Sequence, residues 1–380
     1  MIRRIAIFFG TRPEAIKMAP VIKAFQAAPG FRVLSVSTGQ HREMLQQVVD
    51  LFGIRVYHDM DVMIARQTLA TLSSRLIEKA DAFLEAEKPD MALVQGDTTT
   101  VLMVALACFY RQIPVGHVEA GLRTGNILSP FPEEANRKLV TPLAALHFAP
   151  TEWSKANLMA ESVPEASIEV TGNTVIDALR YEEEQQKQPG MAAQLEMQLD
   201  LLLGNDWRRR QMILITGHRR ENFGWGFEAI CRSIARLARS FSEVLFVYPV
   251  HLNPSVSGPV HERLAGLPNV RLILPQSYRP FVALMRASTL VLTDSGGVQE
   301  EAPSLGKPVL VMRDTTERPE GVESGTVRLV GADEEGIFRG VHELLTNQET
   351  YSKMSTAKNP YGDGNASARI VSAVRRFFVG

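Results

Sequence analysis

The stretch "TLVLTDSGGVQEEAPSLGKPVLVM" (289–312) decides the fold. It holds two runs of apolar residues, 289–294 and 308–312, joined by a glycine turn and a segment of helical length. An uninterrupted apolar run, as opposed to an alternating one, is typical of a strand buried on both faces. The order strand, helix, strand therefore predicts a βαβ unit within a parallel sheet.

The same alternation extends through the rest of the chain. Corresponding apolar runs lie at 4–10, 32–38, 91–96, 114–119, 146–150, 212–217, 244–250 and 270–274. A charged, amide-rich segment at 181–211 separates the two halves, and the last residues have apolar positions at helical spacing. We predict two Rossmann-like, doubly wound parallel-sheet domains facing a cleft. The first spans 1–172 with a returning C-terminal helix at 365–380, and the second spans 173–364.

The bulk composition limits the possible functions. The chain has 380 residues, with 41 basic and 42 acidic side chains, so it lacks the global positive field of a nucleic-acid-binding protein. No apolar run reaches the ~18 residues of a membrane span, and the run at 4–10 is too short for a signal peptide. Cys108 and Cys231 lie in separate helical patterns, which favours free thiols and a cytoplasmic location. Zinc-ligand spacings and a G-x-S-x-G motif are absent from the sequence, so we expect no metal and no acyl transfer.

Ligands of doubly wound sheets bind beyond the carboxyl ends of the strands, so the loops after the apolar runs hold the candidate site. Arg12 and Lys17 follow the first run, where both could bind one multivalent anion or remain two solvated charges. Asp97 follows the run at 91–96, where it could serve chemistry or merely cap a helix beside Thr98.

Two further carboxylates follow the next run. Glu119 ends a strand and has no helix to cap, because Gly121 breaks the chain two residues later. Glu133 and Glu134 lie in the first turn of a predicted helix, where acids commonly offset the helix dipole by ~0.3–1 kcal/mol each. Several carboxylates at one sheet edge indicate proton-transfer chemistry on a polyol.

The second half contributes cationic and aromatic side chains. His218 directly follows a strand and is followed by Arg219, a combination suited to binding phosphate or transferring a proton. His251 follows another strand in the same way. Gln276 and Phe281 offer an amide and a ring that could read and flank a flat base.

The turn at 294–297 begins a helix with two glycines, and acidic residues follow one turn further in. A single ligand could account for both features. Ser295, Gly296 and Gly297 can present a hydroxyl and N–H groups to phosphates, and Arg318 follows the last strong strand. Glu301 could then accept hydrogen bonds from ribose hydroxyls, as the acid of dinucleotide folds does. A nucleoside diphosphate with an attached sugar satisfies both features.

Ten segments of this sequence resemble the bacterial non-hydrolysing UDP-N-acetylglucosamine 2-epimerases. They are "FGTRPEAIKMAPVI", "GQHREML", "QGDTTT", "PVGHVEAGLRTGN", "SPFPEEANR", "TGNTVIDAL", "TGHRREN", "YPVHLNP", "LTDSGGVQEEAPSLGKPVLVMRDTTERPEG" and "NPYGDG". The resemblance implies a glycosyltransferase-B type fold and a homodimer. It also implies that UDP-N-acetylglucosamine and UDP-N-acetylmannosamine interconvert without NAD or metal, for cell-surface polysaccharide synthesis. The reaction would proceed by elimination of UDP to a 2-acetamidoglucal, followed by re-addition.

The resemblance also assigns roles residue by residue. The catalytic candidates are Asp97, Glu119, Glu133 and His218. The substrate-binding candidates are Arg12, Lys17, Gln276, Phe281, Ser295, Gly296, Gly297, Glu301 and Arg318. A second substrate molecule acting as an activator would contact Gln40, Glu43, Arg66, Glu133, Arg219 and His251; position 43 is Glu where some regulated relatives have Gln.

Three other functions fit the same sequence features. They are a glycosyltransferase of this architecture, a hydrolysing epimerase that releases N-acetylmannosamine and UDP, and a nucleotide-sugar sensor without turnover. The number of acids on the sugar side argues against the sensor, because binding alone rarely needs three carboxylates.

Overall fold

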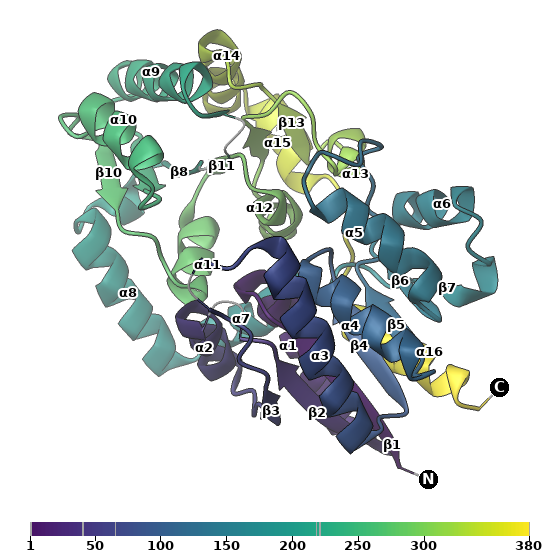
Figure 1. The fold of residues 1–380 in the computed structure, drawn as a ribbon. Helices are drawn as coiled ribbons and strands as arrows, with labels where there is room; N and C mark the ends of the chain where they lie inside the picture. Colours follow the sequence, from purple (N-terminus) through teal and green to yellow (C-terminus); the bar gives the residue numbers. More distant parts are fainter. Residues whose placement is uncertain (1, 40–41, 65, 218, 220–221, 380) are drawn as a thin grey trace. The chain divides into compact units, whose positions relative to one another are not determined.

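The computed structural model describes residues 2–39, 42–64, 66–217, 219 and 222–379, and the chain divides into two compact units (Figure 1). Unit 1 comprises Met1–Arg180 and Tyr361–Gly380, and unit 2 comprises Tyr181–Pro360. The division falls within the helix α7 (Thr174–Gln186) and again at 360–361. Each unit is built around its own parallel sheet.

The described part of unit 1 contains a seven-stranded sheet in the order β3-β2-β1-β4-β5-β6-β7, and every pairing is parallel. This is the doubly wound order, with its switch point between β1 and β4. The strands are β1 (Arg3–Phe9), β2 (Phe31–Ser37), β3 (His58–Asp59), β4 (Met91–Gln95), β5 (Val115–Val118), β6 (Leu146–Ala149) and β7 (Ile168–Val170).

Helices bury the faces of this sheet. The helices are α1 (Arg12–Ala27), α2 (Arg42–Phe52), α3 (Leu69–Glu87), α4 (Thr99–Tyr110), α5 (Glu133–Val140), α6 (Glu152–Ala160) and α16 (Ala366–Phe377). Helices α3 and α4 pack side by side and share a core with Ala6 and Phe8 of β1. The alternating residues Ile5 and Ile7 point to the opposite face and are equally buried. Burial on both faces explains why β1 is a continuous apolar run.

Unit 2 repeats the same topology. The described residues form a six-stranded parallel sheet in the order β10-β9-β8-β11-β12-β13, with its switch point between β8 and β11. Its strands are β8 (Met212–Thr216), β9 (Leu245–Pro249), β10 (Val270–Ile273), β11 (Leu290–Thr293), β12 (Val309–Val311) and β13 (Val327–Leu329). Its helices are α8 (Pro189–Leu203), α9 (Trp225–Ser240), α10 (Pro254–Leu264), α11 (Tyr278–Ala287), α12 (Gly296–Glu301), α13 (Pro319–Glu323), α14 (Glu334–Thr346) and α15 (Gln348–Thr356).

The predicted fold class, two doubly wound parallel-sheet α/β units, is confirmed. Each of the ten apolar runs corresponds to a strand. The prediction missed β3, β7 and β13, all of which are short strands at sheet edges. An edge strand pairs on one side only and needs no continuous apolar run, which is why "HD" (58–59) carries no strand signal.

The C-terminal segment belongs to unit 1. Helix α16 packs against α1, and Ala366 N and Ser367 N donate to the two carboxylate oxygens of Asp177, at 3.2 and 2.8 Å. These bonds satisfy the first N–H groups of α16 and anchor its start to α7. Among the described residues, no helix combines the length and the apolar character needed to cross a membrane.

Candidate functional site

In unit 1, the loops after β1, β4 and β5 bring the predicted carboxylates to the carboxyl edge of the sheet. The centre of this edge is Glu119, which directly follows β5 and is 8% exposed. Its φ angle is 63°, in the left-handed region that non-glycine residues seldom occupy. A residue held in this backbone conformation is typical of a functional site, because the surrounding contacts must keep it there.

Those contacts come from three separate elements. Lys17 Nζ forms an ion pair with Glu119 Oε1, and Gln95 Nε2 donates to Glu119 Oε2. Asn173 Nδ2 donates to Oε1 at 3.0 Å. Lys17 is itself 8% exposed, so a buried cation and a buried carboxylate face each other. The structure therefore places Lys17, predicted to bind an anion, on a catalytic candidate of the same unit.

Asp97 lies in the loop after β4 and is held by α5. Arg137 Nη2 and Nε lie 2.6 and 2.9 Å from Asp97 Oδ2, and Asn136 Nδ2 donates to the Asp97 carbonyl at 2.8 Å. Burial opposes the charge of Arg137, but Asp97 and Glu134 outweigh it and raise the pKa of the guanidinium. The alternative that Asp97 caps α4 is wrong, because the N-cap of α4 is Thr98.

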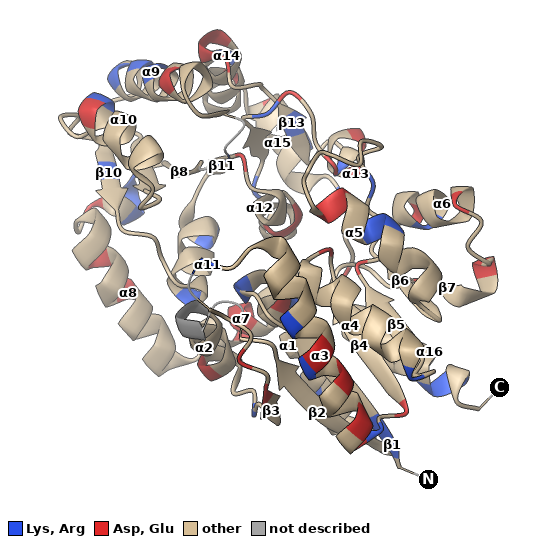
Figure 2. Ribbon diagram, in the orientation of Figure 1, with Lys and Arg blue, Asp and Glu red and all other residues tan. Residues whose placement is uncertain are grey.

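Helix α5 begins with acidic residues (Figure 2), namely Glu133 and Glu134, whose contacts differ. Glu134 is fully buried and accepts hydrogen bonds from Thr124 N at 3.1 Å and Gly125 N at 3.2 Å, and it pairs with Arg137 Nη1 at 3.0 Å. Its role is thus to fix the loop after β5. Oε2 of Glu133 is buried, and it accepts no hydrogen bond within the described part of the chain.

The backbone N–H groups just before α1 are already hydrogen-bonded by a side chain of the same segment. Thr11 is the N-cap, and Glu14 Oε2 accepts from Gly10 N at 2.6 Å and Thr11 N at 2.9 Å, which completes a capping box. Glu14 also accepts a hydrogen bond from the Thr98 hydroxyl, and burial raises the pKa of this carboxyl. Arg12 is the half-buried first residue of α1. An anion here would therefore meet the Arg12 side chain, because Glu14 already binds these N–H groups.

In unit 2, the loop after β11 leads into α12 and lies against Arg318. Arg318 Nε is 2.6 Å from Glu300 Oε1, and Arg318 Nη1 is 2.6 Å from Glu317 Oε1. A Cβ at Gly296 would lie only 2.5 Å from Arg318 Nη1, so this glycine makes room for the guanidinium. Ser295 is the N-cap of α12, and Gly296 and Gly297 are its first residues.

The base- and ribose-binding candidates are joined in the same unit. The Tyr278 hydroxyl donates to Glu301 Oε1 at 2.7 Å, which ties the start of α11 to the end of α12. Gln276 precedes α11, and its amide donates to the Leu274 carbonyl at 2.6 Å. Phe281 lies one turn into α11 and is half-buried. The structure thus gathers these three candidates, Gln276, Phe281 and Glu301, around two connected helices.

The remaining candidates are less tightly grouped. His218 and Gln40 lie outside the described residues, as does the side chain of Glu43. Arg219 N donates to Asp294 Oδ2 at 2.8 Å, which joins the loops after β8 and β11 at the switch point. His251 and Arg66 are exposed, in loops of unit 2 and unit 1 respectively.

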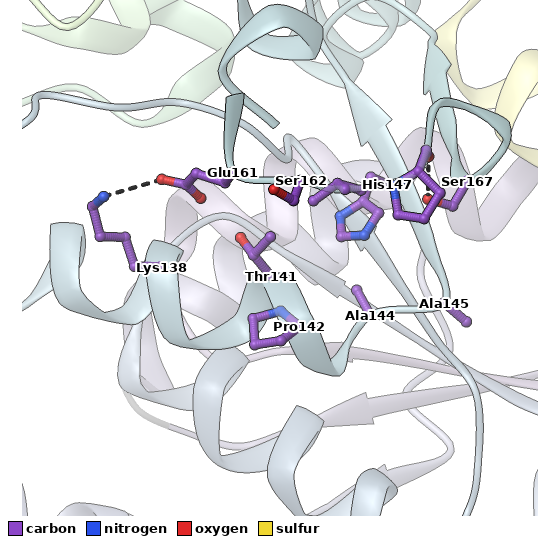
Figure 3. A pocket seen from close by; sticks show the side chains of 11 residues that line it. Lys138, Thr141, Pro142, Ala144, Ala145, His147, Glu161, Ser162 and Ser167 are labelled. Carbon is purple, nitrogen blue, oxygen red and sulfur yellow. Dashed lines mark hydrogen bonds and ion pairs between the residues drawn. The ribbon is translucent and has the colours of Figure 1, made fainter. Parts of the chain in front are cut away.

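A separate cavity of about 640 Å³ lies in unit 1 where β6 and β7 begin, at the amino edge of the sheet. Figure 3 shows its lining, with the ion pair between Lys138 Nζ and Glu161 Oε1 at 3.0 Å. His147 also lines it. The predicted site residues lie elsewhere, so this cavity is no part of the candidate site.

Sequence reasoning missed several residues that hold the candidates. The spacing T-x-x-E at 11–14 is a capping-box signal that could have identified Glu14. Arg137 lies three residues after Glu134, a spacing at which opposite charges on a helix meet and which could have identified this pair. Asn173 lies in the quoted segment "TGNTVIDAL" but received no role, because only the tertiary fold brings it to Glu119.

The fold and the site together define a class, the two-domain parallel α/β proteins whose charged residues gather at the carboxyl edges of their sheets. Residues 23–375 match the family model described as UDP-N-acetylglucosamine 2-epimerase. The chain belongs to the UDP-N-acetylglucosamine 2-epimerase family.

Individual relatives agree over their full lengths. The chain is 55% identical to the UDP-N-acetylglucosamine 2-epimerase of Yersinia pestis, over 98% of each chain. A crystal structure of the Neisseria meningitidis UDP-GlcNAc 2-epimerase bound to UDP-GlcNAc has a TM-score of 0.93 and 50% identity, and the match covers 98% of this chain and 100% of that one. The Methanocaldococcus jannaschii enzyme in complex with UDP-GlcNAc and UDP has a TM-score of 0.83 and 31% identity, with 99% and 100% covered.

Proposed function

We propose that this protein epimerises UDP-N-acetylglucosamine at C2 to UDP-N-acetylmannosamine, reversibly and without releasing the free sugar. The observation that carries the proposal is a pair of carboxylates, each held by a buried cation, at one sheet edge of unit 1. Glu119 is held by Lys17 and Asp97 by Arg137. Family membership supplies the substrate, because relatives over the full chain are UDP-N-acetylglucosamine 2-epimerases.

The chemistry explains why several carboxylates are needed. The C2 hydrogen of the sugar is not adjacent to a carbonyl and is a very poor acid. A carboxylate removes this proton while the C2–H electron pair forms the C1=C2 double bond, and the anomeric C–O bond breaks to release UDP. In the reverse step a proton is added to the opposite face of C2 and the diphosphate oxygen returns to C1. Two faces require two proton carriers.

We assign this proton transfer to Asp97, Glu119 and Glu133 of unit 1. The leaving UDP carries the largest charge that develops in the reaction, so stabilising it is the main electrostatic task. Arg12 and Lys17 serve this task from unit 1. His218 holds or protonates the diphosphate.

Unit 2 is proposed as the UDP-binding domain. Ser295, Gly296 and Gly297 offer a hydroxyl and backbone N–H groups to the phosphates. Arg318 adds a guanidinium that Glu300 and Glu317 hold in place. Gln276 and Phe281 bind the uracil, and Glu301 accepts hydrogen bonds from the ribose.

Three finer features belong to the same proposal. The protein works as a homodimer, and its product supplies N-acetylmannosamine units for a cell-surface polysaccharide. A second molecule of substrate acts as an activator through Gln40, Glu43, Arg66, Arg219 and His251, with Glu133 shared between the two sites.

The test follows UDP-N-acetylglucosamine by NMR in D2O without an acceptor. Epimerisation predicts deuterium at C2 and the appearance of UDP-N-acetylmannosamine. Release of UDP with free N-acetylmannosamine would instead identify a hydrolysing epimerase. A C2 position that keeps its proton while UDP is released would indicate a transferase, and a substrate left unchanged would indicate a sensor.

Substitution of the proposed base gives a second test. Asp97→Asn is expected to lose turnover and to keep its affinity for UDP, because the phosphates and the uracil are proposed to bind to other residues. The matched control is Asp81→Asn, which alters an Asp–Arg pair between α3 and the end of α4, where Asp81 Oδ2 accepts from Arg111 Nη2 at 2.7 Å. Wild-type rates in Asp97→Asn would remove Asp97 from the mechanism.

A further inference from the structure

The loop that carries Asp97 is fastened to β5 by a histidine that takes no part in the mechanism above. His117 lies on β5, two residues before Glu119, and is 2% exposed. Its Nε2 is 2.7 Å from the carbonyl oxygen of Gly96. A carbonyl oxygen can only accept, so His117 carries its proton on Nε2 and donates it.

Gly96 is bonded to β5 through both of its backbone groups. Its N–H donates to the Val118 carbonyl at 3.0 Å, and its carbonyl accepts from His117. The φ angle of Gly96 is 82°, a conformation that suits glycine and turns the chain sharply at the end of β4. The direction in which Asp97 leaves the strand is therefore set at this residue.

The imidazole of His117 is a neutral structural donor. Its pKa is lowered to about 4, mainly by burial and also by the cations Arg123 and Arg137, while the Gly96 carbonyl and Glu119 oppose the shift. Its Nδ1 is buried and has no hydrogen bond from the described residues. A group that is neutral at pH 7 and bonded to the backbone through its one proton is suited to holding a loop.

We propose that His117 is a positioning residue, which aims the Asp97 carboxylate by holding the carbonyl of Gly96. This inference rests on the proposed function, in which Asp97 transfers a proton at C2. Further along the loop, the Asp97 carboxylate is held by Arg137 and the Thr98 hydroxyl by Glu14. His117 acts one residue before both contacts, where the loop leaves the strand.

The neighbouring strand provides a matched control. His147 pairs in register with His117, is also 2% exposed, and has a pKa lowered by burial to about 4. Its Nδ1 is likewise buried without a hydrogen bond from the described residues. It lines the cavity of Figure 3, and its backbone hydrogen bond is to Ala144, not to Gly96. Replacing either histidine removes a buried imidazole, but only His117 releases the Gly96 carbonyl.

The experiment compares His117→Phe, His117→Gln and His147→Phe with wild type. It measures kcat and KM for UDP-N-acetylglucosamine, UDP affinity by calorimetry, and the melting temperature. A misplaced catalytic group can cost on the order of 10²-fold in rate, so His117→Phe should lose about that factor in kcat with unchanged UDP affinity. His117→Gln, whose amide Nε2 can donate to the same carbonyl, should recover most of kcat, and His147→Phe should keep it.

The inference is overturned if His117→Phe retains wild-type kcat, or if His147→Phe loses as much. If His117→Phe does not fold, His117→Asn replaces it, since its amide is too short to reach Gly96. Equal rates in the Asn and Gln variants would then overturn the inference. A wild-type enzyme that fails to epimerise would refute the proposed function itself, which is a different outcome from an unimpaired variant.

Discussion

Removing the guanidinium of Arg137 should destabilise unit 1 more than any surface substitution. Arg137 donates to Asp97 Oδ2 from Nη2 and Nε, and to Glu134 Oε2 from Nη1 at 3.0 Å. The side chains of Arg137 and Glu134 are 7% and 0% exposed, whereas that of Asp97 is 26% exposed. In Arg137→Met, water can therefore hydrate Asp97, but Glu134 is left as a buried carboxylate without its cation.

The expected loss follows from that unpaired charge. Breaking a buried ion pair by removing one partner costs about 3–5 kcal/mol. For a domain of this size each kcal/mol lowers the melting temperature by about 2–4 °C, which predicts a decrease of roughly 6–20 °C. Urea unfolding of wild type and variant, monitored by circular dichroism, measures the free-energy difference directly.

Two companions sharpen this measurement. Glu134→Gln removes the negative charge that Arg137→Met leaves unpaired. The double variant should therefore regain part of the stability that Arg137→Met loses. Arg339→Met is the exposed control, because its side chain is 73% exposed and lies 3.7 Å from Glu335, and it should show no measurable change. If Arg137→Met loses less than about 1 kcal/mol, the buried pair does not stabilise the unit as argued.

Two further predictions concern the turns at the sheet edges. Gly296→Ala places a methyl group 2.5 Å from Arg318 Nη1, and the displaced guanidinium should weaken UDP binding roughly 10–100-fold by calorimetry, the value of a charged hydrogen bond. Gly297→Ala is the control, since its nearest neighbour would be 3.9 Å away, and equal affinities in the two variants would contradict the role of Arg318. Burial raises the pKa of Glu14, so its contribution to stability is present below the unfolded value near 4.5 and is lost as pH rises through the folded pKa. Glu14→Gln should therefore gain stability relative to wild type from pH 4 to pH 8, and parallel urea-unfolding curves would refute this.

The sequence predicted the central strands because their signal is local. A strand covered on both faces must be apolar throughout, as β4 is over Met91–Gln95, where every residue is buried. Three of the four edge strands among the described residues were missed, because such a strand pairs on one side only and is partly buried, as in β13 (Val327–Leu329), whereas the edge strand β10 (Val270–Ile273) kept a largely apolar run. The limit of prediction was therefore set by the degree of burial.

The candidate site was predictable for a topological reason. In a parallel doubly wound sheet all carboxyl ends meet at one edge, so Asp97 and Glu119 were expected together before any contact was known. The partners that hold them could not be read in the same way. Asn173 reaches Glu119 from 54 residues away, and Arg137 reaches Asp97 from 40 residues away. Such distances are closed only by tertiary packing, which leaves no short-range pattern.

The two units use one topology for opposite electrostatic purposes. At the switch point of unit 1, Glu14 accepts from the N–H groups of Gly10 and Thr11, just before α1, and the edge beside it carries carboxylates held by cations. At the switch point of unit 2, the chain enters α12 through two glycines, and the described residues provide no side-chain cap there. The arginine beside it is held by Glu317, whose own pKa falls well below its usual range because Arg318 and Arg313 outweigh its burial. A capped helix start repels an added anion, whereas an uncapped one beside a fixed guanidinium attracts it, and this contrast supports the proposal that the carboxylates of unit 1 transfer protons and that unit 2 binds UDP.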